Sequence, residues 1–143
     1  MGTGVKLPTD PTERKKIPIY SGVLKYFPDA IAEVAKVSWA GNEQHNKGEP
    51  LHWAREKSTD HEDTTIRHLM EAGEFDTDGQ RHTAKAAWRI LATLQLEIEA
   101  DRKKLESQMK MQIQKAVIET KAEQSVIYHQ AEEEKDAISK KWK

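Results

Sequence analysis

The chain has 143 residues, enough for one domain with a modest core, but only 36% are hydrophobic and 33% are charged. It has no cysteine, which excludes disulfides and thiolate metal sites, and its formal net charge of -1 favours neither nucleic acid nor an acidic membrane as a partner. No apolar run reaches the roughly 20 residues that a membrane span needs, and the N-terminus lacks the apolar core of a signal peptide. We therefore expect a cytoplasmic protein, part of which is an exposed helix, an arm or an oligomer contact.

The distribution of helix breakers divides the chain. All five prolines lie within the first 50 positions and all seven glycines within the first 79. We expect an all-α fold, a small helical bundle with a long C-terminal helix that forms oligomers. Residues 1–28 should form an extended arm with a short ordered piece at 19–26, residues 29–99 a helical ligand-binding domain, and residues 100–143 a long helix for oligomer or partner contact.

The first helix of the bundle has clear signals at its start. Pro28 and Asp29 suit a first helical turn, and Gly41 is expected to end the helix. Four residues repeat at helical spacing and predict one face: Ile31, Val34, Ala35 and Ser38. The following segment, 41–57, reads as a polar loop rich in histidine, asparagine and tryptophan, a composition typical of loops that contact ligands.

Start and stop signals also predict a second helix. Ser58 or Thr59 can cap its N-terminus, with Glu62 completing a capping box, and Gly73 is expected to stop it after Ala72. Its apolar stripe would be Ile66, Leu69 and Met70. A tight turn follows, because aspartate and glycine supply the side-chain hydrogen bonds and the positive φ that such turns need. The turn residues are Asp76, Asp78 and Gly79.

A third helix begins near Gln80, and nothing in the sequence stops it at Glu99. Its first part should pack on the other two helices through Ala84, Ala87, Trp88, Leu91, Leu94 and Ile98. A thin stripe continues through Leu105, Met109, Ile113, Ala116, Thr120, Ile127, Ala131 and Ile138. This stripe is too irregular for a good heptad coiled coil, and a lone polar helix of this length is unstable. The helix therefore pairs with copies of itself as one rod, or folds back near Lys110 or Lys121.

The candidate chemistry lies in residues 39–88, which hold five of the six histidines and three of the four tryptophans. Asp60 and Asp63 share a helix face and can hold a divalent cation through oxygen ligands; the alternative is that they only favour the positive end of the helix dipole. Arg67, beside His68, can grip a phosphate with two hydrogen bonds; the alternative is a surface ion pair with Asp63.

Two further groups of side chains can contact a ligand. His82 and Lys85 lie in the first turn of the third helix, where free backbone amides attract anions; the alternative is an ordinary helix start with a solvated lysine. In the loop, His45 and His52 flank Trp53, which can stack on a purine or simply anchor the loop. Among the other tryptophans, Trp39 and Trp88 are expected in the core.

These motifs together resemble bacteriophage proteins of the dATP/dGTP diphosphohydrolase N-terminal domain family, over roughly residues 17–99. The motifs that carry the resemblance are NEQHN at 42–46, GEPLHW at 48–53, Asp60-x-x-Asp63, RHL at 67–69, Asp76-x-Asp78-Gly79 and Arg81-His82-x-Ala84-Lys85-x-Ala87-Trp88. The family is similar to the all-α nucleotide pyrophosphohydrolases of the MazG type. The resemblance implies an oligomeric phage enzyme, acting in the bacterial cytoplasm, that cleaves a purine deoxynucleoside triphosphate with a divalent metal.

By position, the resemblance makes residues 29–99 a nucleotide-binding domain and gives Asp60 and Asp63 the metal, with Glu43 as a third ligand or base and Mg²⁺ or Mn²⁺ as cofactor. The substrate-binding residues would then be His45, His52, Trp53, Arg67, His68, His82 and Lys85. The first helix departs from the MazG pattern, because Glu33 is followed by Lys36 where a second glutamate is expected.

Three functions therefore compete. The first is hydrolysis of a purine nucleoside triphosphate to monophosphate and pyrophosphate. The second is a non-catalytic phage protein that sequesters a nucleotide signal of host defence. The third is a structural protein assembled through residues 100–143, with no small ligand.

Overall fold

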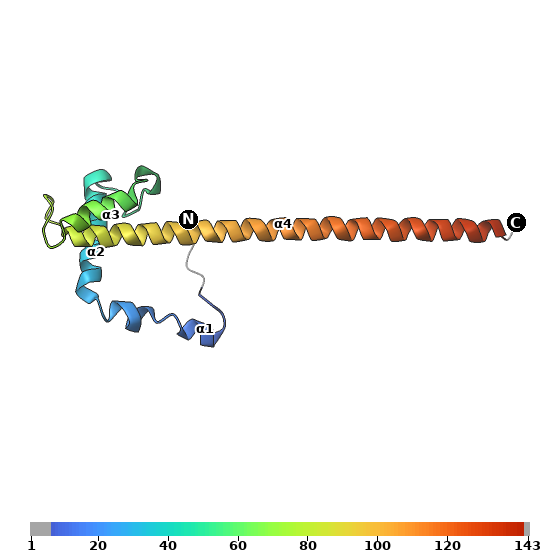
Figure 1. Ribbon diagram of the computed structural model, residues 1–143, viewed down its shortest axis with the longest axis horizontal. Helices are drawn as coiled ribbons and strands as arrows, with labels where there is room; N and C mark the ends of the chain where they lie inside the picture. Colours follow the sequence, from blue (N-terminus) through green and yellow to red (C-terminus); the bar gives the residue numbers. More distant parts are fainter. Residues whose placement is uncertain (1–6, 142–143) are drawn as a thin grey trace. The chain divides into compact units, whose positions relative to one another are not determined.

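The computed structural model describes residues 7–141, and every regular element in that range is a helix (Figure 1). The predicted all-α class is confirmed; the one β-type pairing in the described range is an isolated bridge between Phe75 and Arg81. The chain divides into two compact units, Met1–Leu94 and Gln95–Lys143. No helix within residues 7–141 is both long and apolar enough to cross a membrane.

The N-terminal segment is more helical than predicted. Helix α1 covers Pro11–Lys15, and the Asp10 carboxylate caps it by accepting hydrogen bonds at 2.9 Å from the backbone amides of Thr12 and Glu13. The predicted extended arm is therefore wrong at this point, because an Asp-Pro pair supplies both an N-cap and a preset first turn. The ordered piece expected at 19–26 is confirmed as a five-residue π-helix, Tyr20–Leu24.

Helix α2 covers Pro28–His45 and begins where the sequence predicts. Its predicted end at Gly41 is wrong, since the helix continues through that glycine for another turn. A single interior glycine costs roughly 1 kcal/mol relative to alanine, which neighbouring helical residues can absorb. The stop comes later, at Asn46, and is followed by Gly48 with a φ of 86°.

Helix α3 covers His61–Met70, after a single 3-10 turn at Arg55–Lys57. Its N-cap residue is Asp60 rather than Ser58 or Thr59, and the helix ends at Met70, two residues before the predicted end. Its buried residues are His61, Thr64 and Thr65. The predicted apolar stripe is exposed instead: Ile66, Leu69 and Met70. The face that α3 turns inward is therefore polar.

The predicted tight turn before the last helix is confirmed. Gly79 has a φ of 76°, and its amide donates to the Asp76 carbonyl at 2.8 Å. The Asp76 amide in turn donates to the Gln80 carbonyl at 2.8 Å. This closed loop brings the chain back to His82, where α4 begins.

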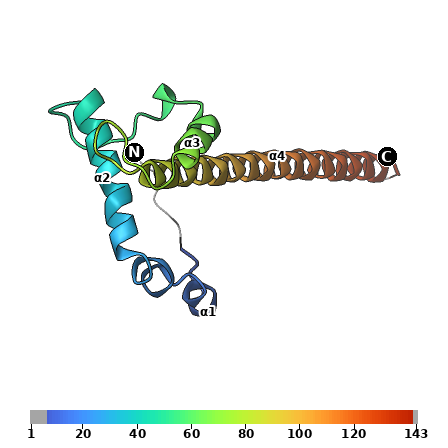
Figure 2. The ribbon, with the colours of Figure 1, turned by 60° about the vertical axis from the view of Figure 1, so that its left-hand side comes forward.

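The interior of the first unit is small and unusually polar. Its buried apolar residues within the described range are three alanines of α4: Ala84, Ala86 and Ala92. Its buried polar residues are Asn42, His61, Thr64, Thr65 and His82. The Trp88 indole donates to the Ser38 hydroxyl at 2.6 Å and ties α4 to α2, and Figure 2 shows α2 and α3 against the first turns of α4. Trp39 is 62% exposed, so its predicted place in the core is wrong.

Helix α4 covers His82–Lys141 without interruption, so no hairpin interrupts it in the described range. The apolar stripe of the second unit repeats every eleven residues rather than every seven. One position of this repeat is Leu94, Leu105, Ala116, Ile127 and Ile138; the other is Ile98, Met109, Thr120 and Ala131. An eleven-residue period corresponds to about 3.67 residues per turn, which explains why a heptad fits poorly.

Two glycines should respond oppositely to alanine. Gly79→Ala places a side chain at positive φ and should lower the free energy of unfolding by about 1–2 kcal/mol. Gly41→Ala lies in helix α2 with open space around the added Cβ and should raise it by about 0.5–1 kcal/mol. Urea unfolding followed by circular dichroism measures both, and equal effects at the two positions would contradict the assigned backbone.

Candidate functional site

The first unit contains a cavity of about 760 Å³ between α2, the loop after it and the start of α4. Small-molecule sites in proteins are typically about 300–1,000 Å³. Five of the seven residues predicted to bind substrate line it: His45, His52, Trp53, His68 and Lys85. The other two, Arg67 and His82, do not belong to its wall.

An aromatic cluster forms one side of the cavity. The ring of Trp53 lies edge-on to that of Trp88, with 5.6 Å between ring centroids, and 6.1 Å from the ring of His61. The Arg55 guanidinium covers the Trp53 ring, 4.4 Å from its centroid. Trp53 is half-buried, so it both anchors the loop to α4 and presents aromatic surface to the cavity.

Arg89 supplies a positive charge to this wall without a carboxylate partner in the described range. Its guanidinium donates to the Ser58 hydroxyl at 2.5 Å and lies 3.2 Å from Nδ1 of His61. None of the ion pairs found within residues 7–141 involves Arg89. A half-buried guanidinium that two neutral groups orient, with no carboxylate beside it, is a ready partner for a phosphate or carboxylate ligand.

Two buried polar atoms near the cavity lack a hydrogen-bond partner. The Asn42 amide nitrogen donates to the Glu49 carbonyl at 3.0 Å, which fixes the orientation of the amide and leaves its Oδ1 buried and unpaired. Nε2 of His61 is also buried and unpaired. Leaving such an atom without a partner costs about 1–3 kcal/mol. Because Asn42 lines the cavity, a ligand that donates a hydrogen bond to its Oδ1 would recover that cost.

The cavity wall carries more positive than negative charge. Lys57, Lys85 and Arg89 line it, whereas Asp78 is the one carboxylate in the wall. Nζ of Lys85 lies 2.7 Å from Oδ2 of Asp78 and 2.7 Å from Oδ2 of Asp76. The Asp78 carboxylate is therefore already neutralised, and the field in the cavity favours an anion.

The Lys85 ion pairs shift the pKa values of all three partners. The hydrogen bond from Lys85 holds the pKa of Asp76 far below its usual range, helped by the Thr77 amide. Burial raises the pKa of Asp78, but hydrogen bonds from Lys85 and the Gln80 amide outweigh it and leave that pKa lowered. Burial lowers the pKa of Lys85, yet its two carboxylates outweigh this and leave the pKa raised. All three groups therefore stay charged near neutral pH.

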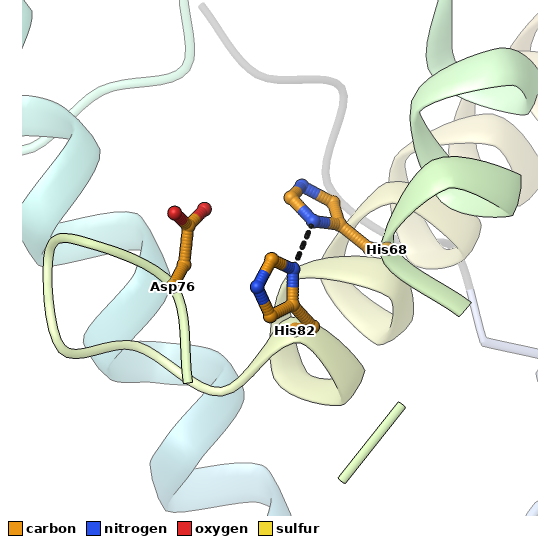
Figure 3. A group of neighbouring side chains, drawn as sticks. All are labelled: His68, Asp76 and His82. Carbon is orange, nitrogen blue, oxygen red and sulfur yellow. Dashed lines mark hydrogen bonds between the residues drawn. The ribbon is translucent and has the colours of Figure 1, made fainter. Parts of the chain in front are cut away.

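A second cluster adjoins the Lys85 pairs. Nδ1 of His68 lies 2.9 Å from Nδ1 of His82, and the Asp76 carboxylate faces the same space, as Figure 3 shows. One potential ligand atom from each residue lies within 4.8 Å of the others. Oε2 of Glu71 is 3.1 Å from Nδ1 of His82. Burial, then the nearby charges of His82 and Lys85, lowers the pKa of His68.

The predicted metal ligands lie elsewhere. The Asp60 carboxylate is engaged by Arg67 at 2.9 Å and by the hydroxyls of Thr64 and Ser58, and these hydrogen bonds, that of Arg67 first, lower the pKa of Asp60 to about 2. Glu43 and Asp63 do not join it in any ligand group found in the described range. The three carboxylates thus do not fit one shared Mg²⁺ in this conformation, and their metal role stays a prediction.

The sequence signals missed three residues of the site. Arg89 follows Trp88 on a predicted packing face, and its sequence position gives no sign that its guanidinium reaches Ser58 and His61. Asn42 lies beyond Gly41, where the sequence predicts a loop rather than a helix. Asp76 has the chemistry of a turn residue, and its separation from His82 by six positions gives no ligand spacing.

Comparison of the chain with protein-family models, curated proteins and solved structures found no match. The resemblance to the phage diphosphohydrolase domains therefore rests on the sequence motifs alone and stays a prediction. The site has to be interpreted from its own geometry: a cavity whose wall carries more cations than carboxylates, with an adjoining cluster of potential metal ligands.

Lys85→Met should lower the free energy of unfolding by about 1–3 kcal/mol, because it leaves the partly buried Asp76 carboxylate and the exposed Asp78 carboxylate without their cation. Lys115→Met is the matched control: its pair with Glu119 is exposed and 3.9 Å long, so the change should stay within about 0.5 kcal/mol. Chemical unfolding of both variants measures the difference. An unchanged free energy of unfolding in Lys85→Met would show that the two ion pairs do not stabilise the turn.

Proposed function

We propose that the chain binds a purine nucleotide in the cavity of its first unit. The observation that carries this proposal is the combination in one wall of a guanidinium without a carboxylate partner, Arg89, an aromatic ring, Trp53, and a buried acceptor without a hydrogen bond, Oδ1 of Asn42. A nucleotide offers the complementary groups: a phosphate for the guanidinium, a planar base for the ring and a ring or amino N–H for the acceptor.

The phosphates of the nucleotide would bind where the wall carries Arg89 and Lys57. Arg89 donates to a phosphate oxygen, and Lys57, whose Nζ donates to the Asn46 side chain at 3.2 Å, adds a second cation. Lys85 attracts a phosphate less strongly than its place at the start of α4 predicts, because two carboxylates already neutralise its charge. His45 and His52 lie on the loop side as further donors or acceptors.

Binding without turnover is the activity that this geometry supports best. The cavity wall holds one carboxylate, Asp78, and it is paired with Lys85. The carboxylates assigned to catalysis, Glu43, Asp60 and Asp63, do not line the cavity. A protein of this kind would sequester a nucleotide, and in a phage such sequestration would remove a nucleotide signal of host defence.

Hydrolysis to monophosphate and pyrophosphate is the second candidate. It is favoured by one observation: His68 belongs both to the cavity wall and to the cluster with Asp76 and His82 that can hold a metal. A cation there would lie beside the bound ligand. Both candidate functions involve the same bound nucleotide. They differ in whether the nucleotide is hydrolysed or released unchanged.

Arg89→Gln should weaken nucleotide binding about 10- to 150-fold, because it removes a charge-assisted hydrogen bond worth roughly 1.5–3 kcal/mol. Isothermal titration with dATP, dGTP, ATP and GTP measures the affinity, and Arg14→Gln in the exposed helix α1 is the matched control. Equal affinity in both variants would contradict the assignment of the phosphate to Arg89.

The same mixtures, resolved by anion-exchange chromatography, separate the two candidates. Intact nucleotide after long incubation with Mg²⁺ or Mn²⁺ supports sequestration. Monophosphate with pyrophosphate supports hydrolysis, and loss of those products in Asp60→Asn with Asp63→Asn would restore the predicted metal role of the acidic pair.

We propose in addition that copies of the chain assemble through the second unit. Its eleven-residue repeat forms a continuous stripe, and the stripe residues Leu105, Met109 and Ile127 are each more than half exposed, at 58%, 53% and 65%. The repeat fits a second copy of the same helix best, because matching periods keep both stripes in contact along their length. The predicted homo-oligomer then removes apolar surface that the chain cannot bury alone.

Leu105→Glu with Ile127→Glu should convert this oligomer to monomers, because each change places a charge in the stripe. Ser125→Glu, on the other side of α4, is the control and should keep the wild-type size. Light scattering coupled to size exclusion measures the mass. A monomeric wild-type chain at tens of micromolar, or an unchanged mass in the double variant, would refute assembly through this stripe.

A further inference from the structure

We infer that His68, Asp76 and His82 form a binding site for a divalent transition metal such as Mn²⁺, Fe²⁺, Co²⁺ or Zn²⁺. The three residues come from α3, from the turn after it and from the first position of α4. This site differs from the carboxylate site that the family resemblance implies. The inference does not rest on the proposed nucleotide function, since the cluster can hold a metal whatever fills the cavity.

The distance between the two histidines carries the inference. Their Nδ1 atoms are 2.9 Å apart, and two nitrogens bound about 2.05 Å from one ion at a right angle would be about 2.9 Å apart. Without an ion, one imidazole N–H donates a hydrogen bond to the other nitrogen at this distance; a metal ion would replace that hydrogen and bind both nitrogens. A ligand atom of Asp76 completes the group, with all three ligand atoms within 4.8 Å.

Backbone hydrogen bonds and the closed turn position His82 and Asp76, and His68 contacts His82 directly. His82 is buried, with 7% of its surface exposed, and its amide donates to the Glu74 carbonyl at 3.2 Å. Asp76 is fixed by the Thr77 amide, which donates to its Oδ1 at 2.6 Å, and by the closed turn. Because these positions are set before any ion arrives, binding costs little rearrangement, which is the condition for a specific site.

The donor set selects the class of metal. Two imidazoles and one carboxylate suit Mn²⁺, Fe²⁺, Co²⁺ or Zn²⁺, whereas Mg²⁺ prefers oxygen ligands and keeps its waters. The Glu71 carboxylate lies 3.1 Å from Nδ1 of His82 but does not belong to the group of three ligand atoms. Three protein ligands leave positions for water or for an anionic ligand.

Lys85 competes with the metal for Asp76. Its Nζ lies 2.7 Å from Oδ2 of Asp76, so the ammonium neutralises this carboxylate when no ion is bound. The same Nζ also lies 2.7 Å from Oδ2 of Asp78. When a metal takes Asp76, Lys85 therefore retains a carboxylate partner and is not left as an uncompensated charge.

Titration of the metal-free full-length chain with Co²⁺, followed by its visible absorption, tests the site directly. We expect one strong site per chain, displaced by Zn²⁺ and not by millimolar Mg²⁺. His68→Gln and His82→Gln should each weaken binding at least 10-fold, whereas His129→Gln, on the exposed part of α4, should leave it unchanged. Unchanged binding in both site variants, or displacement by Mg²⁺, would overturn the inference.

Lys85→Gln is expected to tighten metal binding, a result that damage to the fold would not produce. Removing the competing ammonium should tighten Co²⁺ binding several-fold, although the same change removes ion pairs of the turn. Weaker Co²⁺ binding in this variant would overturn the competition between Lys85 and the metal. Circular dichroism of each variant confirms that the helical content is retained before the titrations are compared.

Discussion

The need to satisfy buried polar groups shapes the first unit more than apolar packing does. Three alanines make up its fully buried apolar part in the described range, while histidines, threonines and an asparagine fill the rest. Each buried polar atom has to be paired or its desolvation destabilises the fold. Most are paired: Trp88 with Ser38, Arg89 with Ser58, and His68 with His82. Two buried side-chain atoms in the described range are not paired: Oδ1 of Asn42, a residue that lines the cavity, and Nε2 of His61, which does not belong to the cavity wall.

The same composition explains the apolar surface. Since histidine and threonine occupy the inner face of α3, its isoleucine, leucine and methionine face outward. In the second unit the apolar residues follow an eleven-residue repeat, which a single helix cannot bury. The proposed ligand binding and the proposed self-association thus have the same origin: polar side chains lie inside the first unit, and apolar side chains lie on the surface.

Much of the helical order could be predicted from the sequence, because starts and turns depend on local chemistry. Pro28 begins α2, and Gly79 closes the turn before α4, as expected. What periodicity could not predict is which face of α3 turns inward, because Ile66 looks like core until its neighbours are known. The sequence predicts several residues of the candidate site but not how they come together. Arg89 and Asp76 become site residues only through tertiary contacts.

A crystal structure of the full-length chain with a non-hydrolysable dATP analogue would test the central claim most directly. The account predicts electron density for the nucleotide in the cavity, with a phosphate oxygen on Arg89 and the base within hydrogen-bonding distance of Oδ1 of Asn42. Nucleotide bound instead on the Asp60 and Asp63 face, or a cavity filled by the side chains of a second copy, would contradict it.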